Sequence, residues 1–341
     1  MKELNIAITG IGYLSPDGFG KVVFDEQILR GFEKREFENF DPHGFLEKKG
    51  LRFIPKATQM YCNLAFQCIQ QNNLAVIIAQ TPDRVGLYDG SELANIEDAL
   101  LFDLVAKVDG PDYVSPMKAP NTLANSSASY AAIKSGIKGP NVSLSGGAGG
   151  CLQALDMAAL HLTYQIIDHG IVVSTEVASH YHEAIRRGKA DTKGHFYAVP
   201  LGISFNLSRL DDALTQRQPI LALIQDTNSG QKMDFETAEQ TFMRVVEPLL
   251  NNNIGEIMIG GLNNIEPEIL KGLIRDYFPK WQGTISFPEK VYGISENSSS
   301  GLNILYALQQ KEQATAKTKG QTILIASIDS IGYINALTVT I

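Results

Sequence analysis

The stretch from Gly139 to Leu160 constrains the fold of this chain more than any other part of the sequence. The apolar run Val142–Leu144 predicts a strand, the sequence GGAGG at 146–150 predicts a tight turn, and the apolar spacing after it predicts a buried helix. Glycine allows positive φ and close backbone approach, and the start of a helix directs free N–H groups into the turn. Together they form an elbow that can hold a nucleophile or an anion, and the residue at its tip is Ala148.

The composition is that of an ordinary globular chain and excludes several function classes. With 341 residues, of which 44% are hydrophobic and 19% charged, the chain can bury a large core. A net charge of −8 argues against nucleic acid and anionic membranes as partners. Three cysteines without a CxxC pair favour a reducing, cytoplasmic location and give neither a disulfide framework nor a zinc site. We expect no cofactor and no metal ion.

The opening residues predict a strand and not a signal peptide, because their apolar run is too short for one. No apolar run in the chain approaches the roughly 18 residues that span a bilayer. We therefore expect no membrane as a partner.

Strand and helix patterns alternate along the chain, which favours an α/β stack of layers. The predicted strands are 4–9, 84–88, 142–144, 171–175, 200–207, 219–225, 256–259, 322–328 and 336–341. The predicted helices outside the elbow are 58–71, 96–108, 126–137, 235–250, 265–277 and 298–310. Two halves emerge, each with an early strand, surface helices, a glycine turn and a small-residue helix. They are alike in plan but not visibly in sequence.

Two weaker motifs, one for dinucleotide binding and one for metal binding, have simpler interpretations. Gly10 and Gly12 follow a strand, but no third glycine completes a dinucleotide-binding fingerprint. His180 and His182, with Glu183 beside them, have the side-chain types that bind metals, but such ligands must also converge in space. We interpret residues 179–198, which also contain His195, as a polar surface loop.

Three segments carry a resemblance to a known family. They are IAITGIGYLSP at the start, FENFDPHGFLEKKGLRFIPKATQMYCNLAFQ before the first long helix, and the run from VSPMKAP to the elbow helix. The chain resembles the β-ketoacyl-acyl carrier protein synthases of the condensing-enzyme superfamily, well over residues 1–175 and loosely over residues 200–341. The resemblance implies a thiolase-like α/β fold, with two pseudo-repeated halves in a five-layered αβαβα stack. It also implies a dimer formed through the strand that leads into the elbow.

The same resemblance divides the chain and assigns positions to the catalytic residues of the family. The expected halves are 1–175, with the elbow at 145–151, and 200–341, joined by a connecting loop region at 176–199. Condensing members use a cysteine at the elbow tip and two histidines in the second half. Here Ala148 stands at the nucleophile position, Gly260 and Gly261 at the first histidine position, and Ile294 at the second. The last histidine of the chain is His195, so no shift of alignment restores the triad.

Other residues near the elbow offer alternative chemistry. Cys151 lies in the first helical turn, where the helix dipole lowers a thiol pKa, but it points about 60° away from Ala148 around the helix. We interpret Cys151, like Cys62 and Cys68, as a packed thiol. The polar candidates of the pocket region are Ser145, Ser295, Glu296, Asn297 and Ser298 to Ser300. The serines and Asn297 are expected to bond to local backbone, which leaves Glu296 as the carboxylate to test.

A retained scaffold without the Cys-His-His triad resembles the chain-length factors of type II polyketide and aryl polyene systems. The resemblance implies a non-catalytic subunit of fatty acid, polyketide or aryl polyene synthesis. Such a subunit would meet an active ketosynthase through residues 115–132 and 142–145, with acyl carrier protein as a further partner. Two alternatives stay open. One is a divergent acyl-thioester transferase, decarboxylase or hydrolase that uses the same acyl pocket, and the other is a homodimeric, non-catalytic acyl-binding protein.

Overall fold

The strands of this computed structural model fall into two series, one in each half of the chain. The structure describes residues 4–22, 41, 45–47, 49–188, 199–251, 253–261, 266–313, 320–329 and 331–341. The strands of the first half are β1 (Ile6–Ser15), β2 (Gly18–Phe19), β3 (Val85–Asp89), β4 (Asn141–Ser143), β5 (His169–Glu176) and β6 (Leu201–Arg209). Those of the second are β7 (Ala222–Gln231), β8 (Ile254–Gly260), β9 (Thr284–Ser286), β10 (Thr322–Ile328) and β11 (Tyr333–Thr340).

Together the strands form one eleven-stranded sheet in the order β4-β3-β5-β6-β1-β7-β11-β10-β8-β9, with β2 paired to β1. The order β4-β3-β5-β6-β1 has the same parallel and antiparallel neighbours as β9-β8-β10-β11-β7. The two series join where β1 pairs antiparallel with β7. The halves are therefore pseudo-repeats in topology.

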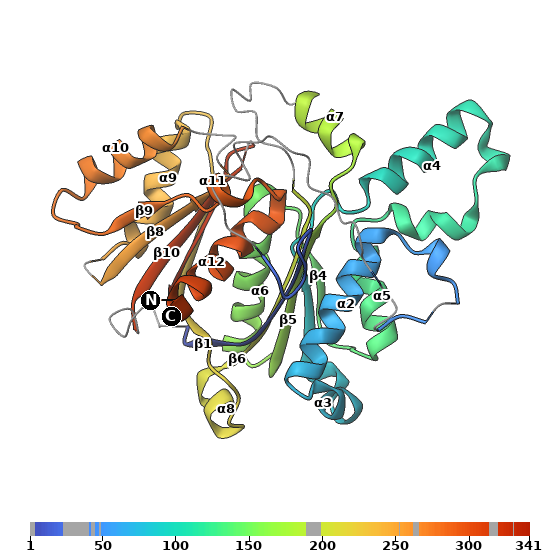
Figure 1. Ribbon diagram of the computed structural model, residues 1–341, viewed down its shortest axis with the longest axis horizontal. Helices are drawn as coiled ribbons and strands as arrows, with labels where there is room; N and C mark the ends of the chain where they lie inside the picture. Colours follow the sequence, from blue (N-terminus) through green and yellow to red (C-terminus); the bar gives the residue numbers. More distant parts are fainter. Residues whose placement is uncertain are drawn as a thin grey trace.

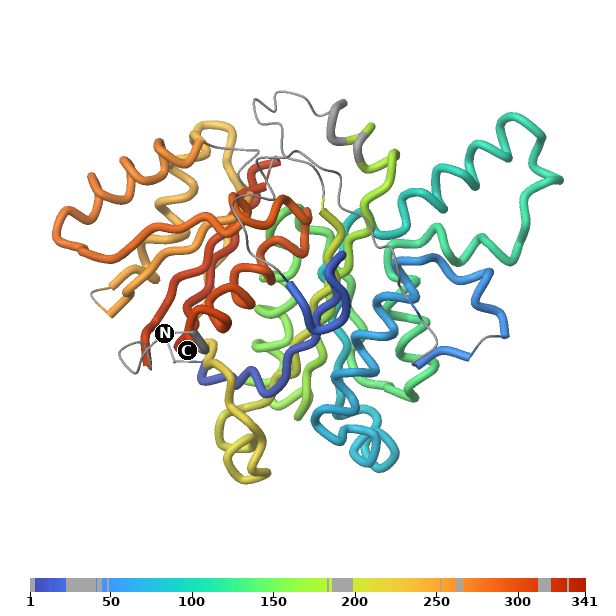
Figure 2. The backbone as a smooth tube through the Cα atoms, in the orientation of Figure 1, coloured from blue at the N-terminus to red at the C-terminus, as the bar shows by residue number. Residues whose placement is uncertain are grey.

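Helices separate and cover the two series of strands. Between them lie α6 (Gly150–Thr163) and α12 (Ser299–Gln313), in the middle of Figures 1 and 2. The first half is covered by α2 (Lys56–Gln71) and α5 (Ser126–Ser135), on the right of Figure 1, and the second by α9 (Ala238–Val246) and α10 (Pro267–Tyr277), on the left. The predicted αβαβα stack is confirmed. The remaining helices are α3 (Leu74–Gln80), α4 (Ile96–Val108), α7 (His180–Gly188), α8 (Leu210–Thr215) and α11 (Glu289–Tyr292).

Each strand series is apolar on both faces because helices cover both. In β10, Ile323 and Ile325 belong to the central core around α6 and α12, whereas Leu324 and Ala326 belong to the outer core under α9 and α10. A third core lies between α2, α5 and the first series. Strands buried on both faces read as continuous apolar runs, as the sequence of β10 does. No helix in the described part of the chain is long and apolar enough to cross a bilayer.

The predicted elements recur, but β1 and β7 run past their predicted ends, at 9 and 225, to Ser15 and Gln231. Further differences concern α7, α9 and β6. Helix α7 occupies part of the segment expected to be a loop, because Ser179 accepts a hydrogen bond at its start from the His182 N–H. Helix α9 is shorter than predicted, since Thr237 caps its start and a 3-10 turn, Glu247–Leu249, follows it. Strand β6 lies between β5 and β1, so it belongs to the strand series of the first half. The second series therefore begins after β6.

The two central helices approach each other through small residues. A Cβ built on Gly301 of α12 would lie 2.8 Å from the Sγ of Cys151 in α6 and 2.9 Å from Cγ2 of Ile203. Cys151 is fully buried. Because interiors are close-packed, a methyl group at position 301 forces these neighbours apart.

The buried end of β3 carries an ionisable group. Asp89 is fully buried, and its Oδ1 accepts a hydrogen bond of 2.9 Å from the Ser91 N–H. Its Oδ2 has no hydrogen-bond partner among the described residues. Burial, opposed by the bonds from Ser91, raises the pKa of Asp89 to about 7. The folded chain therefore holds this carboxyl protonated at mildly acidic pH.

We expect Gly301→Ala to destabilise the chain by about 1–3 kcal/mol, because the added methyl overpacks the contact with Cys151. Gly272→Ala is the matched control, since Gly272 also lies in a helix and a Cβ there meets no atom within 4 Å. The control should be neutral or stabilising by up to about 1 kcal/mol. Urea unfolding of both variants measures the difference, and equal effects would contradict the close packing of α6 on α12.

We expect Asp89→Asn to gain stability over the wild type between pH 5 and pH 8. The pKa of Asp89 is raised in the fold, so the unfolded chain releases this proton first and wild-type stability falls as pH rises towards about 7. Asn removes the titration, and the relative gain should reach roughly 2 kcal/mol. Urea midpoints at both pH values test this, with the exposed Asp112→Asn as control. A pH-independent difference would rule out a buried, protonated Asp89.

Candidate functional site

The elbow has the form that the sequence predicts. Strand β4 ends at Ser143, a 3-10 turn spans Gly147–Gly149, and α6 begins at Gly150. Gly147 has a φ of 58°, the left-handed region that favours glycine. Ala148, at the tip, is 8% exposed and has no group that can act as a nucleophile.

The backbone N–H of the elbow tip is bonded to a carboxylate from the second half. Ala148 donates a 3.2 Å hydrogen bond to Oδ2 of Asp329, in the turn between β10 and β11. The other oxygen, Oδ1, accepts a 2.7 Å bond from the Ile331 N–H. A Cβ on Gly147 would overlap the Asp329 carboxylate, so this contact also requires glycine. The backbone N–H at the elbow tip is therefore occupied by a carboxylate of the chain itself.

Buried polar side chains surround the next two glycines of the elbow. A Cβ on Gly149 would overlap Nδ2 of Asn335 and lie 2.7 Å from Oγ of Ser327. A Cβ on Gly150 would overlap Nδ2 of Asn297. All three side chains are at most 3% exposed. Within the described part of the chain, Asn335 Nδ2, Ser327 Oγ and both amide atoms of Asn297 have no hydrogen-bond partner. Asn335 Nδ2, Ser327 Oγ and Asn297 Nδ2 are donors without acceptors beside the elbow, and Asn297 Oδ1 is an acceptor without a donor.

The first position assigned to a histidine is closed by backbone. Gly261 has a φ of 83°, and a Cβ there would overlap the carbonyl oxygen of Ile328. Its N–H donates to both oxygens of Glu289, each at 3.0 Å. A Cβ on Gly260 would lie 3.4 Å from Glu289 and from Asn303. A buried carboxylate and an amide therefore lie beside this position.

The second position assigned to a histidine lies in a turn that repeats the elbow. Ile294 is 3% exposed, and Glu296 has a left-handed φ of 41° at the start of a 3-10 turn, as Gly147 has in the first half. Ser295 Oγ donates to the Val199 carbonyl at 2.5 Å. Ser298 shares a bond of 2.9 Å with Ser174. These bonds span 96 and 124 residues, and the Asn297 amide has no partner among the described residues, so the expectation that these side chains bond to local backbone is wrong for Ser295, Asn297 and Ser298. The left-handed backbone of Glu296 costs of order 1–3 kcal/mol.

Glu296 lies near a second, fully buried carboxyl group. Burial is the main cause that raises the pKa of Glu176 well above its usual range, and the nearby charges of Glu296, Glu92 and Asp89 raise it further. Glu176 Oε1 accepts a 2.9 Å bond from the Glu92 N–H. The Nε2 of His182 lies 3.9 Å from its Oε2. Sequence reasoning missed this cluster, because its members come from β5, α7 and two turns.

The side chains of the paired histidines contact different neighbours. His182 is 4% exposed and faces Glu176, and its Nδ1 lies 2.9 Å from Oγ of Ser179. His180 is exposed, and its ring stacks on Tyr181 at 3.9 Å between centroids. Residues two apart on a helix point in different directions. Among the described side chains, no group of three metal-binding residues converges. His195 and the side chain of Glu183 lie outside the described residues.

The three cysteines are buried, protonated thiols. Cys62, Cys68 and Cys151 are all buried and unpaired. Burial raises the pKa of each to about 12. A thiol in this state does not supply the thiolate that nucleophilic catalysis needs.

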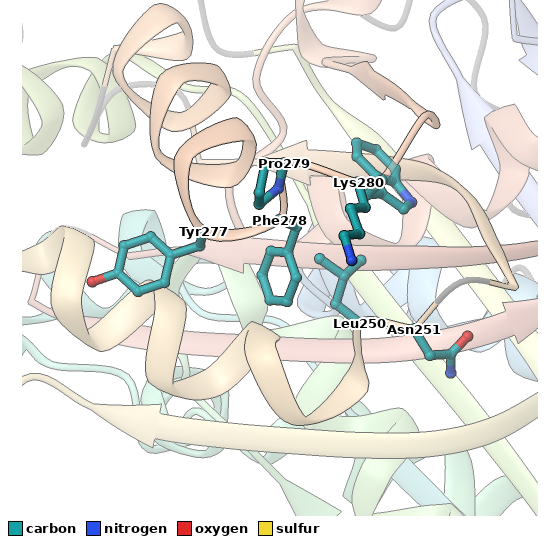
Figure 3. Close-up of a pocket in the computed structure, with 7 residues that line it drawn as sticks. Leu250, Asn251, Tyr277, Phe278, Pro279 and Lys280 are labelled. Atoms are coloured by element: carbon teal, nitrogen blue, oxygen red, sulfur yellow. The ribbon is translucent and has the colours of Figure 1, made fainter.

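A pocket of about 310 Å³ lies away from the elbow, at the end of α10. Leu250, Phe278 and Lys280 converge on it, while the ring of Tyr277 points away (Figure 3). Leu250, Phe278 and Trp281 pack against the outer core of the second half, on the other side of the sheet from α6. The pocket therefore has no access to Ala148 through the sheet.

The chain is similar to curated condensing enzymes over part of its length. It is 28% identical over 204 residues to the 3-oxoacyl-[acyl-carrier-protein] synthase 2 of Coxiella burnetii, covering 52% of this chain and 47% of that protein. It is 26% identical over 157 residues to the enzyme of that name from Staphylococcus aureus, covering 41% and 38%. The match thus spans about half the length of these curated relatives or less. No family model matches the chain.

Solved structures share the whole fold. A chain from the structure of a type II polyketide synthase acyl carrier protein in complex with its ketosynthase, bound to a hexaketide, has a TM-score of 0.79 at 17% identity, covering 100% of this chain and 99% of that one. The ishigamide ketosynthase/chain length factor has a TM-score of 0.76 at 19% identity, covering 98% and 99%. Together with the sequence matches, these structures show that the chain has the thiolase-like fold of the ketosynthases.

Proposed function

We propose that this chain is a ketosynthase-like subunit without condensing activity, which pairs with an active ketosynthase as a chain-length factor does. The observation that carries the proposal is the elbow tip, where Ala148 replaces a nucleophile and its N–H is bonded to Asp329. A condensing step needs a nucleophile to accept the acyl group and donors to stabilise the oxyanion. The elbow tip offers no nucleophile, and its backbone N–H is already bonded to Asp329.

The second half supports the same conclusion. The positions assigned to the histidines hold Gly260, Gly261 and Ile294, and the sequence has no histidine after His195. The backbone at Gly261 leaves no space for a side chain. Decarboxylation of a malonyl unit by two histidines therefore has no counterpart among these residues.

An open sheet edge and an exposed apolar surface support a partner. Strand β4 pairs only with β3 in the described sheet, and unpaired edge strands are templates for association. The segment from α4 to α5 projects from the body of the molecule on the right of Figure 1. Its exposed apolar side chains are Leu101, Leu104, Val108, Tyr113, Met117, Leu123 and Ile133. A surface of this kind fits a protein partner such as the ketosynthase of the ishigamide pair.

The biosynthetic setting of this partnership is proposed from the relatives and structural neighbours. The curated relatives are 3-oxoacyl-[acyl-carrier-protein] synthases, and one structural neighbour was solved with an acyl carrier protein. We therefore propose fatty acid, polyketide or aryl polyene synthesis as the setting, with the ketosynthase as first partner. A homodimer through the same edge is the alternative assembly.

A second candidate function rests on Glu296. This residue keeps a strained, left-handed backbone and lies near the buried carboxyl of Glu176. Strained residues concentrate at functional sites, and a carboxyl group whose pKa is raised by burial, as that of Glu176 is, suits acid–base work. In this alternative the chain is a divergent acyl-thioester transferase, decarboxylase or hydrolase.

Native mass spectrometry tests the assembly. We expect a 1:1 heterodimer when the chain is co-expressed with a cysteine-bearing ketosynthase encoded beside it, and we expect the condensing activity of that enzyme to depend on this chain. A stable homodimer that ignores the ketosynthase would contradict the proposal and favour the acyl-binding alternative.

A charge on the projecting surface should break the assembly. We expect Leu123→Asp, at a side chain 56% exposed, to weaken heterodimer affinity by about tenfold or more, because a charge is buried in the interface. Ile269→Asp is the matched control, at a side chain 48% exposed on α10, at the opposite end of the molecule (Figure 1). Equal affinities for both variants in a titration would exclude this surface.

Acyl-thioester hydrolysis by the isolated chain tests the second candidate. If Glu296 acts as an acid or base, Glu296→Gln should lower the rate by about 10²-fold, while the exposed Glu266→Gln should leave it unchanged. The absence of any turnover by the wild-type chain would remove this candidate.

A further inference from the structure

We propose that a groove between α2, α3 and the end of α5 binds one fatty-acid molecule, with the apolar chain in the groove and the carboxylate at two lysines on its rim. The groove has a volume of about 570 Å³ and lies on the lower right of Figure 1. It opens beside the core under α2 and α5, on the other side of the sheet from α6 and the elbow. The site is therefore independent of the proposed function.

The floor of the groove is apolar. Ile69 and Ile78 line it, are 7% and 5% exposed, and belong to the core under α2 and α5. Phe66 packs against the same core, and its ring stacks on that of Phe45 at 6.2 Å between centroids. A concave apolar surface in this size range suits a small molecule, and an apolar chain gains from leaving water there.

Backbone contacts hold the walls of the groove together. The N–H groups of Lys138 and Gly139 both donate to the Pro82 carbonyl, at 2.9 and 3.1 Å. A Cβ on Gly136, which ends α5, would lie 3.8 Å from Cγ2 of Ile78 in α3. The end of α5 is thus fixed against α3 and the turn that follows it, so the groove is formed before any ligand binds.

Positive charge lies on one rim of the groove. Lys134 and Lys138 are the only ionisable side chains among its lining residues, all of which are described. Both lysines are exposed, and neither forms an ion pair with a described residue, although Glu47 lies near Tyr130 on the same helix as Lys134. In a chain of net charge −8, two unpaired cations beside an apolar floor attract the head group of an anionic amphiphile.

The same rim favours a monocarboxylate over a phosphate or a membrane. The C-terminus of α5 carries a partial negative charge, which repels a second charge on the ligand. No arginine lines the groove to bind a phosphate through two hydrogen bonds. An anionic membrane would face the negative charge of the whole chain. One apolar chain with one carboxylate therefore matches both the floor and the rim.

Calorimetric titration of the isolated chain with octanoate and octan-1-ol tests the role of the lysines. We expect one octanoate per chain, with a Kd on the order of 1 mM. Lys134→Gln together with Lys138→Gln should weaken octanoate binding roughly fivefold and leave octanol binding unchanged, because only the carboxylate loses its partners. Lys107→Gln together with Lys118→Gln, at exposed lysines outside the groove, is the matched control.

A bulky side chain in the groove tests the apolar part. Ala79→Trp, in α3, should weaken binding of both ligands by about tenfold, because the indole occupies the space of the chain. Val76→Trp is the matched control, at a side chain on the same helix that is 62% exposed and does not line the groove.

Four results would overturn the proposal. They are no binding of millimolar octanoate by the wild type, equal octanoate affinities for the lysine pair and its control, equal affinities for the two tryptophan variants, and binding to phosphatidylglycerol vesicles that only the Lys134 and Lys138 pair removes. The last result would assign the lysines to a membrane surface. Because no ketosynthase is present, each result is distinct from a failure of the proposed assembly.

Discussion

The close approach of the two halves at the elbow is the contact on which the site depends. Gly147, Gly149 and Gly150 have no side chains, so the turn between β10 and β11 and the turn before α12 can touch the elbow backbone. Next to the elbow, the absence of a side chain at Gly301 lets α12 pack closely on Cys151 of α6. These glycines therefore allow close contact between the two halves as well as the turn conformation of the elbow.

This approach places carboxylates of the second half on backbone donors of the site. Asp329 accepts a hydrogen bond from the Ala148 N–H at the elbow tip, beside the start of α6, where a negative charge is favourable. Glu289 accepts from the Gly261 N–H, beside the first position assigned to a histidine. Carboxylates of the chain itself therefore occupy these backbone N–H groups.

The periphery of the first half leaves apolar surface exposed. Strand β4 ends the sheet on one side, and apolar side chains of the α4–α5 segment are exposed. Burial of such a surface against a partner is favourable in proportion to its apolar area. The proposed assembly with a ketosynthase depends on this surface.

The sequence by itself determined the alternation of strands and helices, the bounds of α4, the strand, turn and helix of the elbow, and the alanine at its tip. These features are local, because propensity, periodicity and glycine spacing act over a few residues. Only the tertiary structure decided that Asp329 binds Ala148, that Glu176 lies near Glu296, and that β6 joins the first strand series. Each of these joins residues far apart in the chain, and no short pattern records such a pairing. Helix α7 was missed for another reason, since its polar sequence resembles a loop and a cap at Ser179 marks its start.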